Sequence, residues 1–344
     1  KLGAFDTTYF QHFYKYLYQK NIENKSFDAI TNNGYKIYQH YFKSLNLDAA
    51  IEEIIVIPDG QLSYLAFGAL VKNIPDVPNG AFHQLPYLAM DYVFSYNYSA
   101  GILLELKEQE KKYSNSFLGF APTFDKAIFK KNNLDKTEEE VTNIAQLFGN
   151  GKPISGELAT KTQFLEMANQ YGVLHLATHA SAYDSTMKEG AIYFSDEMLT
   201  LQEIYNLPLS AQLAVLSACE SGTGTMATGE GVMSLARAFM YQGVPSVVAS
   251  LWNANDKSTN EIMLKFYQYL KDGKPKAVAL KMAQEHYLNS SSVKNAHPFY
   301  WSSMMMIGDN SELTSYNNDF YKWLILGLLI FSLITFFIFR RGQS

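Results

Sequence analysis

The sequence predicts an α/β protein with a doubly wound, mostly parallel sheet, helices on both faces, and a C-terminal transmembrane helix. Short apolar runs that are typical of buried strands alternate along the chain with longer stretches of helical period. This alternation is typical of parallel sheets, because their crossover connections are helices that cover both faces. A further run of seventeen residues without a charge lies near the C-terminus, at Trp323–Phe339.

The expected strands are short and rich in Val, Ile, Leu and Phe. They lie at Ile54–Pro58, Val93–Tyr98, Phe117–Ala121, Val173–Thr178, Ala191–Phe194, Leu213–Ala218, Val244–Trp252 and Ser303–Ile307. The helices expected between them lie at Glu138–Phe148, Thr160–Tyr171, Glu230–Gln242, Ser258–Leu270 and Ala277–Leu288. The pattern therefore indicates one α/β body, followed by a polar, Asn-rich linker at 310–321.

The first fifty residues differ from the body. Two stretches rich in Tyr and Phe, Phe5–Tyr18 and Tyr35–Leu45, read as amphipathic helices with no strand between them. Residues 1–25 are therefore predicted to form an N-terminal helical segment, which would suit the end of an upstream helical array.

Composition excludes several classes of function. The chain has 28 basic and 33 acidic residues among 344, a formal net charge of −5, and no run of five Lys or Arg residues. A nucleic-acid partner is therefore not expected. Cys219 is the single cysteine, which excludes an internal disulfide framework and a Cys-rich metal site.

The apolar run at Trp323–Phe339 would span about 26 Å as a helix, at the short end of what a bilayer core needs. Arg340 and Arg341 follow it directly, so we predict a transmembrane helix at residues 322–340 and a short tail at 341–344. The alternative is a buried core helix. The two arginines place the tail in the cytoplasm and the body on the non-cytoplasmic side, while a tail-anchored cytoplasmic body is the competing topology.

Two residues with reactive side chains follow neighbouring strands of the expected sheet. The strand Val173–Thr178 runs into His179, and Leu213–Ala218 runs into Cys219 and a glycine-rich turn. Ligand sites of doubly wound sheets lie at the carboxyl ends of the strands, so the imidazole and the thiol are expected at one rim. A thiolate with a neighbouring base is a nucleophilic pair, although a free cysteine is often just a small buried residue.

Two rival motifs are rejected. His175 and His179 have the spacing of helical zinc ligands, but they lack the glutamate of a metalloprotease and lie on an expected strand, where His175 is a packing or supporting residue. The segment Gly222–Ala227 fits a dinucleotide fingerprint, but no acidic ribose partner follows at the required distance. We therefore expect no metal and no cofactor.

Six ordered motifs carry a family resemblance. They are Ile57–Phe67, His175–His179, Leu216–Gly222, Gly229–Gly231 with Leu235–Phe239, Ser250–Trp252 and His297–Trp301. Through them, the chain from about Ser26 to Asp309 resembles a CHAT domain, the caspase- and separase-related cysteine peptidase module often found downstream of tetratricopeptide repeats. The resemblance implies a caspase-like sheet, with Cys219 as nucleophile and His179 as general base.

The resemblance also implies an oxyanion hole formed by the N–H groups of Cys219 and Ala180. The family usually has glycine at the position of Ala180; alanine keeps the N–H but loses a backbone angle available only to glycine.

The segment Ser250–Lys257 resembles the one that lines the first specificity pocket of separases. Asp256 is therefore a candidate to bind a basic P1 side chain, with Trp252 beside it. Glu220 and Asp184 are further candidates for this acidic residue. Asp256 as the N-cap of the following helix is the alternative.

These expectations define two functions. The first is a membrane-anchored cysteine endopeptidase that cleaves a protein or peptide substrate after a basic residue, in a regulated signalling or defence role. Upstream tetratricopeptide repeats or a regulatory protein are its expected partners. The second is a catalytically silent caspase-like scaffold for protein interaction at the membrane, which Ala180 favours.

Overall fold

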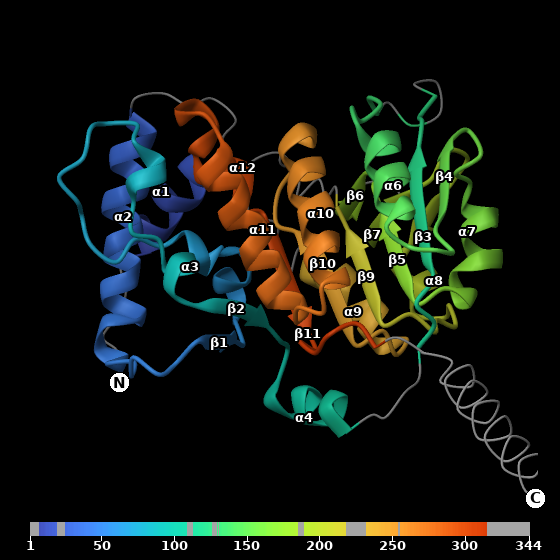
Figure 1. The fold of residues 1–344 in the computed structure, drawn as a ribbon, viewed down its shortest axis with the longest axis horizontal. Helices are drawn as coiled ribbons and strands as arrows, with labels where there is room; N and C mark the ends of the chain where they lie inside the picture. The colour runs from blue at the N-terminus through green and yellow to red at the C-terminus, as the bar shows by residue number, and fades with distance from the viewer. Residues whose placement is uncertain are drawn as a thin grey trace, which may run out of the picture.

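The structure is a computed structural model that describes residues 7–18, 25–108, 113–125, 129, 131–184, 189–217, 232–253 and 255–314. Among them, eight strands form one sheet in the order β1-β2-β11-β10-β9-β5-β3-β4 (Figure 1). Their bounds are β1 Glu53–Val56, β2 Val93–Tyr96, β3 Phe117–Pro122, β4 Lys152–Gly156, β5 Val173–Leu176, β9 Leu213–Leu216, β10 Ser246–Ser250 and β11 Met304–Gly308. A separate sheet contains β6 Ala180–Asp184, β7 Glu189–Tyr193 and β8 Met198–Thr200.

The large sheet is parallel except at one junction. β10 and β11 are antiparallel, whereas all other neighbours in the sheet pair in parallel. Strands β3, β4, β5, β9 and β10 therefore run one way, and β1, β2 and β11 run the other way. We call the edge at which the first five strands end the carboxyl edge. The opposite edge, at which β1, β2 and β11 end, is the amino edge.

Helices cover both faces of this sheet, as the sequence predicts. The layer in front in Figure 1 contains α6 Thr137–Gln146, α10 Asp256–Lys271 and α11 Lys276–Ser290. The other face carries α7 Lys161–Met167, α8 Leu201–Ile204 and α9 Val232–Tyr241, with α9 packed on β10 and on the small sheet. Because both faces are covered, every residue of β3, β5, β9 and β10 is buried.

Close approach of α6 to the sheet depends on a glycine in β3. A Cβ placed at Gly119 would lie 2.9 Å from the ring of Phe117 and 3.0 Å from the Cβ of Val141 on α6. The absent side chain therefore lets the helix pack directly on the strand, next to the residues that lead into the site.

The other helices lie around the β1–β2 side and the ends of the sheet. Their bounds are α1 Thr7–Tyr18, α2 Lys25–Tyr41, α3 Leu88–Asp91, α4 Ala100–Glu108 and α12 Pro298–Trp301. Phe13 and Leu17 of α1 are fully buried in the same hydrophobic core as the sheet. The Tyr18 hydroxyl donates a hydrogen bond to the backbone oxygen of Tyr64 at 2.9 Å. Helix α1 therefore packs as part of the body, while an upstream array stays a prediction.

Each of the eight expected strands is present, with shifted ends, but one lies in a different sheet. The strand expected at Ala191–Phe194 is β7, which belongs to the small sheet. Strands β4, β6 and β8 were not expected. Only Ile154 of β4 is buried, so this edge strand has no apolar run to detect.

In the part of the chain that the structure describes, no helix is long and apolar enough to cross a bilayer. The predicted span at Trp323–Phe339 lies outside the described residues.

Candidate active site

His179 lies at the carboxyl edge, three residues beyond the end of β5, and only 4% of its surface is exposed. Its Nε2 lies 2.8 Å from the backbone oxygen of Asn132. A carbonyl oxygen can only accept a hydrogen bond, so Nε2 carries the proton. In the neutral ring Nδ1 then holds the lone pair, and Nδ1 is the nitrogen that can act as a base.

The loop between β3 and α6 holds this histidine in place. The Phe124 ring packs against the His179 ring with centroids 5.1 Å apart. Within the loop, the Phe124 N–H donates to the Asn133 side-chain oxygen at 2.6 Å. At the end of the loop, the Asp135 N–H donates to a carboxylate oxygen of Asp256 at 2.9 Å. The ring orientation of His179 therefore depends on a loop that Asp256 ties to the start of α10.

A buried polar network links β5 to the helices α6 and α10. His175 is fully buried, with Nε2 2.7 Å from the Glu140 carboxylate and Nδ1 3.1 Å from the Tyr267 hydroxyl. Burial raises the pKa of Tyr267 well above its ordinary value, so this hydroxyl keeps its proton and can donate to Nδ1. Nε2 then donates to Glu140, and β5 is joined to α6 and α10. His175 is thus a supporting residue.

Cys219 and Glu220 lie outside the described residues. The structure does describe the chain up to Ser217, whose N–H donates to the backbone oxygen of Leu176 at 3.1 Å. Leu176 and Leu216 are register partners on β5 and β9. His179 follows Leu176 by three residues, and Cys219 follows Leu216 by the same number.

Ala180 begins β6 and pairs with Ile192 of β7. The described non-glycine residues with positive φ are Asn46 and Lys136, so Ala180 does not have one. The backbone at this position therefore does not use an angle that only glycine adopts, and alanine fits here without strain.

Asp256 is the first residue of α10, and the N-cap is Asn255, whose side-chain oxygen accepts from the N–H groups of Lys257 and Ser258. The interpretation of Asp256 as the N-cap is therefore wrong. Asp256 is half-buried, and burial raises the pKa of its carboxyl, which the N–H of Asp135 opposes.

The other two described candidates are engaged elsewhere. Trp252 is 2% exposed, and its indole N–H donates to the Phe299 backbone oxygen at 2.9 Å. The Tyr18 ring packs on it with centroids 4.4 Å apart. Trp252 is thus a core residue in this structure and does not line an open pocket, contrary to the sequence-based expectation. Asp184 accepts a hydrogen bond from the Tyr193 hydroxyl at 2.6 Å.

Sequence reasoning missed Asn132, Glu140 and Tyr267. Glu140 ends a run of three glutamates that looks like a solvated helix start. It lies four residues before Ile144 and is therefore in phase with the buried face of α6. That phase is the signal that could have found it. Asn132 acts through its backbone oxygen, so no side-chain motif identifies it.

The CHAT domain profile matches residues 31–309 of this chain. The chain belongs to the CHAT domain family. A segment of it is 25% identical over 220 residues to tetratricopeptide repeat protein 28 of Homo sapiens, and 24% identical to the same protein of Mus musculus. These matches cover 53% of this chain and 9% of each relative, so the chain spans a small part of the curated relatives that it matches.

Two solved structures of gingipain share the fold at low sequence identity. The complex of the pro- and mature domains of RgpB from Porphyromonas gingivalis aligns with a TM-score of 0.50 at 9% identity, covering 88% of this chain and 76% of that chain. The Arg-specific cysteine proteinase gingipain R (RGPB) aligns with the same TM-score and identity, covering 88% and 74%. The separase–securin complex of Saccharomyces cerevisiae aligns over 66% of this chain and 15% of that chain, with a TM-score of 0.44 at 14% identity. The gingipain alignments and the eight-stranded, mostly parallel sheet give this CHAT domain the caspase-like α/β fold.

Proposed function

We propose that this CHAT domain is a cysteine endopeptidase in which Cys219 is the nucleophile and His179 is its general base. The observation that carries the proposal is the register of β5 and β9. Paired residues Leu176 and Leu216 each precede one member of the dyad by three positions, on strands that lie about 4.8 Å apart. Chain connectivity keeps the Cα of Cys219 within about 7 Å of the Cα of Ser217, which is bonded to the end of β5.

The chemistry follows from the tautomer of His179. Nδ1 takes the proton of the Cys219 thiol, and the thiolate attacks the carbonyl carbon of the scissile peptide bond. The C–N bond breaks as Nδ1–H protonates the leaving amine, which leaves a thioester on Cys219. Water then attacks the thioester carbonyl carbon as Nδ1 again takes a proton. The C–S bond breaks, the carboxylic acid leaves, and the proton on Nδ1 returns to the Cys219 sulfur. The N–H groups of Cys219 and Ala180 are proposed to stabilise the oxyanion.

A basic P1 residue is the substrate class that Asp256 supports. Its half-buried carboxylate lies at the carboxyl edge, at the start of α10, and one of its oxygens accepts from the Asp135 N–H. A guanidinium suits a partly desolvated carboxylate of this kind. Gingipain R, which shares the fold, is named as an Arg-specific proteinase. Glu220 and Asp184 stay further candidates for the acidic residue that binds the P1 side chain.

We also infer that residues 323–339 anchor the chain in a membrane as a single pass, with the body more favourably on the non-cytoplasmic side. Support comes from the uncharged run and from Arg340 and Arg341 after it. A tail-anchored cytoplasmic body is the competing topology. Upstream tetratricopeptide repeats are proposed as partners because the curated relatives are named for that repeat. The proposed role is regulated cleavage in signalling or defence.

A peptide electrophile that ends in arginine tests the proposal. We expect it to form a covalent adduct on Cys219 of the full chain, found by mass spectrometry, and to inhibit cleavage of an arginine peptide. Cys219→Ala should abolish both adduct and cleavage while leaving the fold intact. Cleavage that persists in Cys219→Ala would end the cysteine-peptidase proposal, because the chain has no other cysteine.

The second candidate function is a catalytically silent scaffold. The feature that favoured it is Ala180, but this residue has no positive φ, and its backbone N–H is retained. A wild-type chain that neither reacts with the electrophile nor cleaves any arginine peptide would favour the scaffold.

A further inference from the structure

We propose that α4 is a second membrane contact, which lies on the bilayer surface and holds the amino edge of the sheet toward the membrane. The carboxyl edge, with His179, then faces away from it. This inference rests on the proposed membrane anchor at residues 323–339.

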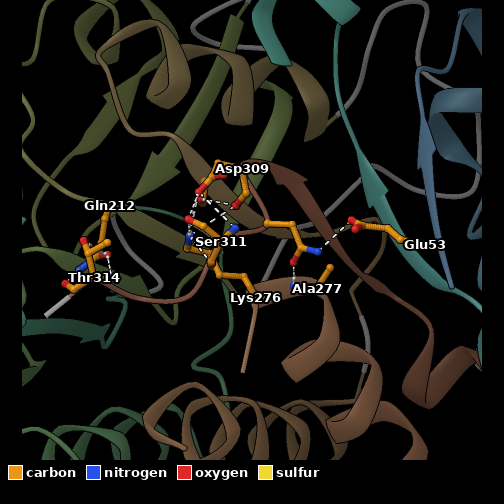
Figure 2. A network of polar contacts seen from close by, with 9 residues as sticks. Glu53, Gln212, Lys276, Ala277, Asp309, Ser311 and Thr314 are labelled. Atoms are coloured by element: carbon orange, nitrogen blue, oxygen red, sulfur yellow. Dashed lines mark hydrogen bonds and ion pairs between the residues drawn. The ribbon is translucent and has the colours of Figure 1, made fainter. Parts of the chain in front are cut away.

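The last segment that the structure describes is firmly held to the body. We call residues 309–314 the exit strap. Figure 2 shows its anchor, the Lys276 ammonium, which is fully buried and lies 3.1 Å from an Asp309 carboxylate oxygen and 2.7 Å from the Ser311 backbone oxygen. A buried ammonium with these partners fixes the start of the strap to the N-terminus of α11.

Further contacts fix the rest of the strap. The Asn310 side chain donates to the Glu53 carboxylate at 2.8 Å and accepts from the Ala277 N–H. At its end, the Thr314 N–H donates to the Gln212 side-chain oxygen at 2.8 Å, and Gln212 donates back to the Thr314 backbone oxygen at 3.0 Å. The strap is therefore tied to the body along its length and does not swing freely.

These contacts place the exit at the amino edge. The Asp309 N–H donates to the backbone oxygen of Pro245, which precedes β10, and Gln212 immediately precedes β9. Both strands end at the opposite edge, where His179 lies. The exit of the chain and the candidate active site are therefore separated by the length of the strands.

Helix α4 lies at the same edge as the exit. It follows β2, which ends there, and it projects beyond the sheet in Figure 1. Two of its apolar side chains are exposed, Leu104 by 62% and Ile102 by 36%. Leu103 and Leu106 on the same helix line a hollow of about 500 Å³ whose other wall includes the exit strap. Exposed apolar side chains on a short helix beside the exit indicate an apolar partner at this edge.

The chain itself brings a bilayer to this surface. Eight residues lie between Thr314 and Trp323, so the predicted span begins at most about 30 Å from the strap. A contact made under such a tether is intramolecular, and two exposed apolar side chains can hold it although they would not bind a membrane alone. Glu105 of α4 is also exposed, which favours the headgroup region over the hydrocarbon core.

The orientation has a consequence for the substrate. With the amino edge on the membrane, His179 faces the aqueous phase, on the far side of the sheet. The substrate class is then an extended segment of a soluble protein or domain, and a transmembrane segment of another protein cannot reach the site.

Spin-label depth measurements test the inference on the full chain in phosphatidylcholine vesicles. In a Cys219→Ser background, single cysteines replace Leu104 on α4, Leu158 as the matched control, and Ser332 within the predicted span. Leu158 is 69% exposed and follows β4 at the carboxyl edge. Collision rates of each nitroxide with oxygen and with a water-soluble nickel complex report whether it lies in lipid or in water.

We expect the oxygen-to-nickel ratio to be severalfold higher at positions 104 and 332 than at 158. If position 332 reports lipid while 104 matches 158, the anchor stands and the inference about α4 is overturned. If position 332 reports water, the anchor itself fails and the inference falls with it. A lipid signal at 158 that exceeds the one at 104 would reverse the proposed orientation and overturn it as well.

Discussion

The Nε2 atom of His179 is 2.8 Å from the backbone oxygen of Asn132, and this contact decides which ring nitrogen can act as a base. The carbonyl requires a proton on Nε2, so Nδ1 is left with the lone pair. The loop between β3 and α6 therefore has a chemical role as well as a packing role. Because Asp256 holds the end of that loop, the proposed base and the proposed specificity residue are physically connected.

The first prediction concerns the base. His179→Ala should lower kcat/KM for an arginine peptide by about 10²- to 10⁴-fold, since the thiol loses its proton acceptor. His286→Ala is the matched control, because His286 is an exposed histidine on α11. The measurement is steady-state cleavage by the full chain. Equal activity in the two variants would contradict a role for His179 in the chemistry.

The second prediction concerns specificity. Asp256→Asn keeps an oxygen that can accept from the Asp135 N–H but removes the charge. We expect cleavage after arginine to fall by about a hundredfold relative to cleavage after an uncharged residue. Asp272→Asn, at the exposed end of the same helix, is the control. An equal fall for both substrates would mean that Asp256 acts through the loop, and a wild-type preference for aspartate at P1 would exclude a basic pocket.

The third prediction concerns the exit strap. Burial lowers the pKa of Lys276, and the charge of Asp309 opposes that shift. The buried ammonium therefore depends on the Asp309 carboxylate beside it. Lys276→Met should lower the free energy of unfolding by about 3 kcal/mol, because it leaves the Asp309 carboxylate without its cation. Adding Asp309→Asn should recover part of that loss.

Urea unfolding of the full chain measures these changes, with the exposed Lys274→Met as control. A double variant less stable than Lys276→Met alone would show that the two residues contribute independently.

The fourth prediction concerns pH. Burial lowers the pKa of His297 to about 4, from about 6.5 in the unfolded chain. Between these values the unfolded chain binds more protons than the folded one, so the free energy of unfolding falls as the pH falls from 6.5 to 4. The shift corresponds to about 3 kcal/mol of stability that is present above pH 6.5 and lost near pH 4.

His297→Asn should flatten this dependence while keeping an acceptor for the Phe299 N–H, which the His297 ring now provides at 3.0 Å. His286→Asn controls for the loss of an exposed histidine. The measurement is the free energy of unfolding between pH 4 and 7. If its slope with pH is the same in His297→Asn as in the wild type, His297 is not the cause of the pH dependence.

Much of the fold was predictable because its signals are local. The strands β3, β5, β9 and β10 are buried on both faces, so each leaves a continuous apolar run in the sequence. His179 could be assigned to the rim because it directly follows such a run. β4 and β6 left no such run, and the small sheet could not be separated from the large one, since alternation along the chain does not say which strands pair.

The sequence by itself determined the strand–helix alternation, the positions of His179 and Cys219 after their strands, and the uncharged run at 323–339. Only the tertiary structure decided that Asn132 fixes the tautomer of His179, that Trp252 is a core residue, and that α4 and the exit strap share an edge opposite the site. The physical reason is separation along the chain. Apolar periodicity records how each segment is buried, whereas hydrogen bonds between residues 47 or more positions apart, such as His179 with Asn132, depend on how the segments are folded together.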